Sequence, residues 1–318
     1  MGGAGPILGI DIGGTKLAVG VVQPDGRVLA EDRQPSHASD GPDAMIERVI
    51  AMSRAAMADA QAVAGEVAAI GIGCGGPLDP WRGVVLNALN NPGWIDIPLV
   101  ELIQDALGRP AYLDNDANAA ALGEVRFGAG RGVGHMVYLT ISTGVGGGVI
   151  LDHRLYRGAN GNAAELGHIS VAVRGGRPCH CGSVGCLEMY ASGTSIAARY
   201  REALGPDAAP TVTAGDVAEA VRRGDPTATA IWDETMELLG GAVVSVIHAF
   251  NPQLVVLGGG VTQSGDLLFE PVRRVVKERA MPWLAEAVRV VPAELGRLTG
   301  VLGAVAVALD RMEQPALA

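Results

Sequence analysis

Residues 7–22 read ILGIDIGGTKLAVGVV: an apolar run, a glycine turn and a second apolar run. This pattern predicts strands at 7–12 and 17–22. The turn between them consists of Gly13, Gly14, Thr15 and Lys16. It is not a Walker loop, because a strand follows it and the order is Gly-Thr-Lys rather than Gly-Lys-Thr. Glycine lets backbone N–H groups approach a phosphate, and Asp11 is placed to meet a phosphate-bound Mg2+.

The layout recurs in residues 136–151, which read MVYLTISTGVGGGVIL. The second turn carries Ser142, Thr143 and Gly144. Two opposed hairpins of this kind predict a clamp for both ends of a polyphosphate. A third glycine cluster follows the apolar run 254–257 and consists of Gly258, Gly259 and Gly260. A nucleotide could rest there, although Gln263 breaks the Gly-x-Gly-x-x-Gly spacing of a dinucleotide site.

Three of the four cysteines lie in residues 165–188, ELGHISVAVRGGRPCHCGSVGCLE. The thiolates of Cys179, Cys181 and Cys186 favour tetrahedral Zn2+. For the fourth ligand we favour His168, predicted on the polar face of a strand, over His180, which is wedged between two cysteines. The alternative is a disulfide plus a spare thiol, which such short loops would strain.

Two glutamates, Glu165 and Glu188, bracket the cysteines. A closed Cys3His zinc site has no open coordination position, so it holds structure rather than performing chemistry. We therefore expect it to fix both glutamates and the His168 ring around a polar ligand. Exposed surface glutamate is the simpler alternative for each of them.

The residues Asp114, Asn115 and Asp116 end a predicted strand and open a helix over 117–127. Either aspartate could be an N-cap, but three polar residues exceed what a cap requires. Near a helix N-terminus a carboxylate stays ionised and ready to accept a proton. Asn90, in an asparagine-rich loop, is equally consistent with a turn and with a hydrogen bond to a sugar hydroxyl.

The composition of the 318-residue chain suits two lobes or one large domain. The net charge of −10 disfavours a nucleic-acid partner. Polar residues interrupt the longest apolar run, 240–261, which argues against a membrane span. Free cysteines and the lack of an apolar signal segment predict a cytoplasmic protein. Further helices are predicted over 42–64, 226–250, 266–279 and 299–312.

Together, these motifs resemble the ROK family of bacterial sugar kinases and repressors, within the actin/hexokinase-like superfamily. The segments that carry the resemblance are DIGGTK (11–16), DNDAN (114–118), ELGH (165–168) and CHCGSVGCLE (179–188). The resemblance implies a two-lobed α/β, actin-like ATPase (ribonuclease H-like) fold with an interlobe cleft. We expect a small lobe from 1–117 and 300–318 and a large lobe from 118–299, joined near 116–130 and 297–302.

The resemblance also implies roles for individual residues. Asp116 becomes the catalytic base. The implied sugar ligands are Gly76, Asn90, Asn115, Asp116, Glu165, His168 and Glu188. The implied zinc ligands are His168, Cys179, Cys181 and Cys186. The implied ATP and Mg2+ contacts are Asp11, Gly13, Gly14, Thr15, Lys16, Ser142, Thr143, Gly144, Gly258, Gly259 and Gly260. Two departures, Gly75 in place of a common proline and Ser142 in place of glycine, leave the particular sugar undecided.

The expected function is phosphorylation of a hexose at its 6-hydroxyl, with glucose as the first choice. N-acetylmannosamine, N-acetylglucosamine, mannose and fructose are alternatives, and polyphosphate is an alternative donor to ATP. Family habit implies a homodimer, or a tetramer. A sugar-responsive repressor would carry an N-terminal DNA-binding domain, whereas only six residues precede the first predicted strand. A non-catalytic sugar-sensing regulator stays open.

Overall fold

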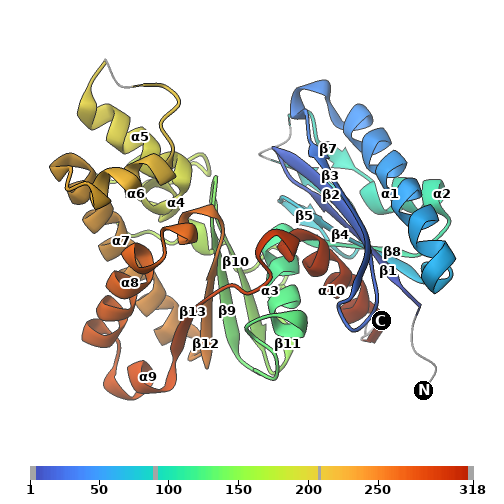
Figure 1. The fold of residues 1–318 in the computed structure, drawn as a ribbon. Helices are drawn as coiled ribbons and strands as arrows, with labels where there is room; N and C mark the ends of the chain where they lie inside the picture. Colours follow the sequence, from blue (N-terminus) through green and yellow to red (C-terminus); the bar gives the residue numbers. More distant parts are fainter. Residues whose placement is uncertain (1–4, 89–91, 207–208, 314–318) are drawn as a thin grey trace. The chain divides into compact units, whose positions relative to one another are not determined.

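Two α/β units make up the chain in the computed structural model, which describes residues 5–88, 92–206 and 209–313 (Figure 1). The first unit comprises Met1–Gly132, Leu155–Ala163 and Glu294–Ala318. The second comprises Val133–Arg154 and Ala164–Ala293. Each unit is built on its own five-stranded sheet.

The sheet of the first unit has the strand order β3–β2–β1–β4–β8. Its strands are β1 (Ile7–Ile12), β2 (Lys16–Val22), β3 (Val28–Pro35), β4 (Ala69–Cys74) and β8 (Ala111–Asn115). β1 pairs antiparallel with β2 and parallel with β4, which pairs parallel with β8. The register sets Asp11 beside Gly73 and Gly73 beside Asp114. The first glycine turn and residues 114–116 therefore meet at one edge of the sheet.

Helices cover both faces of this sheet (Figure 1). On one face lie α1 (Pro42–Ala64) and α2 (Leu99–Leu107), which bury residues such as Val49 and Ile103 at helical spacing. On the other lie α10 (Thr299–Glu313) and α3 (Asp116–Phe127), which pack against each other. A separate sheet consists of β5 (Leu78–Asp79), β6 (Val84–Asn87) and β7 (Ile95–Ile97).

Only glycines at the ends of strands were given a predicted role from the sequence. Several other glycines lie inside strands. A Cβ on Gly71 would lie 1.7 Å from the carbonyl oxygen of Ala304, and one on Gly9 would lie 2.4 Å from that of Val301. Glycine at these positions lets α10 approach the sheet with backbone against backbone.

The sheet of the second unit has the order β11–β10–β9–β12–β13. Its strands are β9 (Met136–Ile141), β10 (Val145–Leu151), β11 (Arg154–Leu155), β12 (Leu254–Gly258) and β13 (Arg289–Pro292). β9 pairs antiparallel with β10 and parallel with β12, so the plan of the first sheet recurs. The helices of this unit are α4 (Glu188–Ala191), α5 (Gly193–Leu204), α6 (Ala214–Arg222), α7 (Pro226–Phe250), α8 (Asp266–Arg279) and α9 (Pro282–Ala287).

Helix starts in the second unit follow from local sequence. The Asp225 side chain accepts from the Ala228 N–H at the start of α7, and Pro226 occupies its first turn. Thr213 and Asp216 form a capping box at the start of α6. Short 3-10 helices are η1 (Ala38–Asp40), η2 (Leu166–His168), η3 (Gly260–Ser264) and η4 (Gly296–Leu298).

One local prediction was wrong. His168 ends the 3-10 helix η2 rather than opening a strand, since the residues after it pair only through the isolated bridge Ser170–Cys186. The helix α3 packs along α10 and is grouped with the first unit, whereas residues 118–127 were expected in the second lobe. The lobe limits as a whole remain a prediction. In the part of the chain that the structure describes, no helix combines the length and the apolar character needed to cross a membrane.

Candidate active site

The strand β1 carries a desolvated carboxylate, Asp11, just before the first glycine turn. The turn is closed by the Gly13 N–H, which donates to the Lys16 carbonyl at 3.0 Å. Asp11 lies just before the turn, and α10 passes so close that a Cβ on Gly300 would lie 2.0 Å from its Oδ2 atom. Burial and the negative charge of Asp116 raise the pKa of Asp11 to about 7, against an opposing effect of Arg33. A nearby cation would favour the ionised form of the Asp11 carboxylate.

The three polar residues at the start of α3 have separate roles. Asn115 is the N-cap, because its Oδ1 accepts from the Ala117 N–H at 2.9 Å. Asp114 is completely buried and binds Asn118, whose Nδ2 donates to Asp114 Oδ1 at 2.9 Å. The side chain of Asp116 remains accessible to solvent, so a substrate can reach it.

The pKa of the Asp116 carboxyl is raised in the folded protein. The surrounding protein limits its hydration and raises its pKa above the usual 3.8, although the Ala117 N–H donates to its Oδ1 at 2.8 Å. A raised pKa increases the basicity of a carboxylate, which suits it to accept a proton from a hydroxyl. Gly76 lies beside Asn115, because a Cβ on Gly76 would lie 3.3 Å from the Asn115 Nδ2 atom.

The second glycine turn is tied to a carboxylate from elsewhere in the chain. Glu188 Oε2 accepts from the Val145 N–H at 2.8 Å. A Cβ on Gly144 would lie 2.5 Å from that oxygen, so glycine makes room for the contact. Ser142 and Thr143 are exposed at the tip of the turn. The structure therefore brings Glu188 to the second turn, a contact that the sequence analysis did not foresee.

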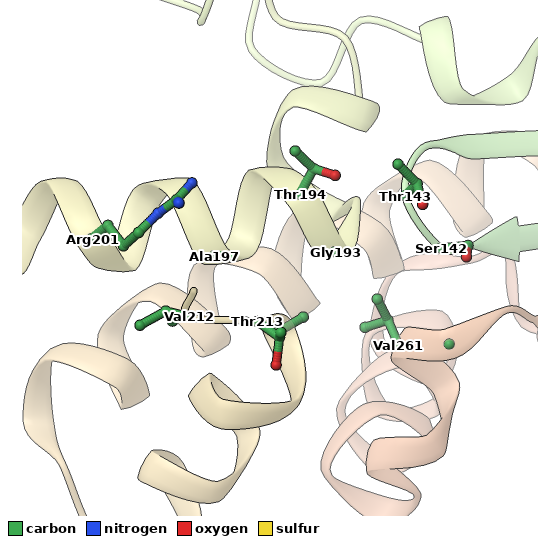
Figure 2. Close-up of a pocket in the computed structure, with 11 residues that line it drawn as sticks. Ser142, Thr143, Gly193, Thr194, Ala197, Arg201, Val212, Thr213 and Val261 are labelled. Atoms are coloured by element: carbon green, nitrogen blue, oxygen red, sulfur yellow. The ribbon is translucent and has the colours of Figure 1, made fainter. Parts of the chain in front are cut away.

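Beside this turn the second unit has a cavity of about 370 Å³ (Figure 2). It is lined by Ser142, Thr143, Gly193, Thr194, Ala197, Arg201, Val212, Thr213, Ala214, Gly260 and Val261. Of the third glycine cluster only Gly260 reaches it. Gly258 is buried against Tyr138, and Gly259, with φ 89°, packs on the Ile141 backbone. The size suits a nucleoside, and the mixture of hydroxyl, apolar and guanidinium groups suits both its base and an attached anion.

The cysteine segment folds into two narrow backbone pairings. One pairing joins Ser170 to Cys186, and the other joins Pro178 to Val184. Next to the second pairing, the Cys179 N–H donates to the Ser183 carbonyl oxygen at 2.8 Å. A Cβ on Gly185, at φ 74°, would lie 2.0 Å from the Ala172 carbonyl, so only glycine fits there. This geometry turns the three sulfur atoms toward one point.

The ligand atoms of His168, Cys179, Cys181 and Cys186 all lie within 4.8 Å of one another. Cys179 Sγ is 3.6 Å from His168 Nδ1, and Cys181 Sγ is 3.6 Å from Cys186 Sγ. Around a tetrahedral zinc, with bonds of about 2.0–2.3 Å, neighbouring ligands stand roughly 3.5–3.8 Å apart. The donor set and its spacing therefore fit Zn2+. His180 is exposed and outside the cluster.

The remaining predicted residues lie as follows. Glu165 is exposed immediately before η2, and its carbonyl accepts from the His168 N–H at 3.0 Å. Thr15 and Lys16 are exposed at the first turn, next to Gly14. Asn90 lies outside the described residues.

Arg157, which binds Asp114, was not predicted from the sequence, and neither were the cavity residues on α5 and α6. The polar start of α5, where Ser192 caps the helix, was an available signal for the cavity.

Comparisons with known proteins identify the family of this chain. The model of the ROK family matches residues 7–311. A glucokinase of Thermotoga maritima is 37% identical over 319 residues, covering 96% of this chain and 98% of that protein. The crystal structure of a ROK hexokinase from Thermus thermophilus superimposes with a TM-score of 0.83 at 35% identity, covering 97% and 99% of the two chains.

A ROK family glucokinase from Streptomyces griseus, solved in complex with glucose and AMPPNP, superimposes with a TM-score of 0.80. It is 35% identical, and the match covers 97% of this chain and all of that one. The predicted α/β, actin-like fold class is thereby confirmed. A family model that spans nearly the whole chain, together with relatives of the same length, shows that this chain belongs to the ROK family.

Proposed function

We propose that the protein is an ATP-dependent kinase that phosphorylates glucose at its 6-hydroxyl. The observation that carries the proposal is Asp116, a solvent-accessible carboxylate of raised pKa at the N-terminus of α3. Its surroundings match what a general base for a hydroxyl nucleophile needs. The similarity to glucokinases favours glucose among the hexoses.

In this proposal Asp116 accepts the proton of the sugar hydroxyl as that oxygen attacks the γ-phosphorus. The N-cap Asn115, the adjacent Gly76 and Asn90 are proposed to bind the sugar. Glu165, His168 and Glu188 are proposed to bind its ring hydroxyls. Phosphoryl transfer needs little covalent help, so positioning by these groups supplies most of the catalysis.

The cavity beside Ser142 is proposed to hold adenosine, with Gly260 at its wall. Backbone N–H groups of the two glycine turns are proposed to bind phosphate oxygens, helped in the first turn by Thr15 and Lys16. Asp11 would hold Mg2+, since hard oxygen donors suit that ion and a cation would relieve the repulsion between Asp11 and Asp116. When bound, Mg2+ neutralises charge on the phosphates.

The Cys3His cluster is proposed to bind a structural Zn2+. With Nδ1 of His168 directed at the metal, its Nε2 is left for the sugar, and the bound metal fixes the ring in one orientation. Glu188 follows the ligand Cys186 by two residues, so the metal would also hold the residue that binds the second turn.

The working state is proposed to be a cytoplasmic homodimer. Four free cysteines agree with a reducing compartment. Light scattering on the purified protein would test the dimer; a monomeric mass would contradict it, and a tetrameric mass would favour the second expectation.

A coupled assay of ADP release over glucose, mannose, fructose, N-acetylglucosamine and N-acetylmannosamine tests the activity. We expect glucose to give the highest kcat/KM with ATP, and polyphosphate to support slower turnover than ATP. A higher kcat/KM for an N-acetylhexosamine would reassign the substrate. Tight glucose binding without steady ADP release would favour the non-catalytic regulator.

A further inference from the structure

Arg157 lies on the segment Leu155–Ala163, which belongs to the first unit although the chain on both sides of it belongs to the second. Its Nε donates to Asp114 Oδ2 at 2.7 Å, and its Nη2 donates to Asp310 Oδ2 at 3.0 Å. The side chains of Arg157, Asp114 and Asp310 are 14%, 0% and 10% exposed. Both carboxylates raise the pKa of Arg157 against the effect of burial, so the guanidinium stays charged.

Asp114 connects this guanidinium to the proposed reaction centre. Its Oδ1 accepts from the Asn115 N–H at 2.9 Å and from Asn118 Nδ2 at 2.9 Å. These contacts hold Asn115, the last residue of β8, and Asn118, in the first turn of α3. Asp116, the first residue of α3, lies between them. A carboxylate buried without a countercharge would be costly, so Asp114 depends on Arg157 to keep this position.

The other end of the segment reaches the same region. The Ala163 N–H donates to the Arg157 carbonyl at 3.1 Å, which closes a loop over residues 157–163. Asn162 Oδ1 accepts from the Leu78 N–H at 3.1 Å. A Cβ on Gly76 would lie 3.9 Å from that Oδ1 atom and 3.3 Å from Asn115 Nδ2. The loop is therefore fixed next to the residues proposed to bind sugar from the first unit.

We infer that Arg157 is a positioning residue for phosphoryl transfer, an inference that rests on the proposed function. By binding Asp114 and Asp310 it fixes both the strand end that leads into Asn115 and Asp116 and the loop that lies beside Gly76, which is proposed to bind the sugar. In this role it acts through Asp114 and contacts neither substrate itself. Because small displacements of reacting groups lower rates steeply, its loss should change sugar binding and turnover as well as stability.

The test uses Arg157→Met, Arg157→Lys and the triple variant D114N/R157M/D310N in the full chain. The triple variant removes all three buried charges, while Asn at position 114 keeps an oxygen for Asn115 and Asn118. The matched control is Arg126→Met. Arg126 also pairs with a carboxylate on α10, Glu313, but at the surface, where ion pairs contribute little.

For each variant we would measure kcat, the KM of glucose and of ATP, the Kd of glucose by calorimetry, and the unfolding midpoint. We expect Arg157→Met to raise the KM and Kd of glucose and to lower kcat, each by about tenfold or more, with little change in the KM of ATP. The triple variant should recover the unfolding midpoint but not the affinity for glucose. Arg157→Lys should fall between wild type and Arg157→Met.

A purely structural role would lower the folded fraction and leave both KM values unchanged. The inference is overturned if Arg157→Met alters only the unfolding midpoint, or if the triple variant regains wild-type glucose affinity together with its stability. A wild-type protein that phosphorylates no hexose would instead remove the proposed function. The calorimetric arm would still decide whether Arg157 controls sugar binding.

Discussion

The two glycine turns occupy equivalent places in two sheets of the same strand order, yet their carboxylates have different origins. In the first, residues 13–16 connect Ile12 to Leu17, and Asp11 comes from the strand itself. In the second, the shorter turn 142–144 connects Ile141 to Val145, and Thr140 takes the place of the aspartate.

The second turn obtains its carboxylate from Glu188, at the end of the cysteine segment. A backbone N–H binds that carboxylate, whereas Asp11 faces the negative charge of Asp116 and has a pKa of about 7. One backbone plan thus supports two kinds of site. The first turn suits a cation and a proton transfer, and the second suits the anchoring of distant residues by hydrogen bonds.

The sharpest test of the first site is Asp116→Asn. Without a basic carboxylate, kcat should fall about 10³-fold, while an amide of the same shape should keep glucose affinity close to wild type. Steady-state kinetics and calorimetry measure the two effects. Asp59→Asn, an exposed aspartate on α1, is the control and should behave as wild type. A kcat within a few-fold of wild type in Asp116→Asn would remove the base assignment.

For the second site, Cys181→Ser should abolish stoichiometric zinc and weaken glucose binding by roughly 10–100-fold, because His168 and Glu188 lose their anchor. Elemental analysis and calorimetry on the same sample follow both quantities. His180→Ala changes an exposed histidine of the same loop outside the cluster and should retain the metal. Zinc-free protein that still binds glucose tightly would contradict the proposed role of the cluster.

A smaller change should break only the contact between the second turn and Glu188. In Gly144→Ala the new Cβ would meet Glu188 Oε2, so the carboxylate must move. We expect the KM of glucose to rise about tenfold, in line with the loss of one hydrogen bond to a charged group. Gly241→Ala, where a Cβ meets nothing within 4 Å on helix α7, is the control. Unchanged kinetics in Gly144→Ala would show that this contact is dispensable.

The smallest expected effect is a shift of the pH dependence of kcat toward higher pH. Asp116 must be deprotonated to act as a base, and its pKa is raised above 3.8 by desolvation. The value of kcat should therefore fall as pH decreases through this raised pKa, with a midpoint above that of a free aspartate. A profile of kcat at saturating substrates measures the midpoint. A profile that stays flat down to pH 3.8 would contradict the raised pKa.

Much of the site was predictable because its parts are local in the sequence. The turn 13–16 and the start of α3 depend on residues close in the chain, so pattern and spacing were sufficient to place them. The N-cap itself is Asn115 rather than either of the two aspartates considered from the sequence. The cluster of Cys179, Cys181 and Cys186 with His168 was also anticipated, and the structure brings these side chains together. The neighbourhood of Arg157 was not predictable, because Asp114 and Asp310 lie 43 and 153 residues away from it.

The sequence by itself determined the strand–turn–strand units, the helix starts and the cluster of residue types that suit a metal, since these follow from short-range backbone preferences and side-chain chemistry. Only the tertiary structure decided which carboxylate serves which turn, and that Asp114 is buried while Asp116 is accessible. It also shows that Gly71 must lack a side chain, because α10 packs directly on its backbone. The physical reason is that burial, desolvation and close packing are set by residues distant in the chain, which only the folded protein brings into contact.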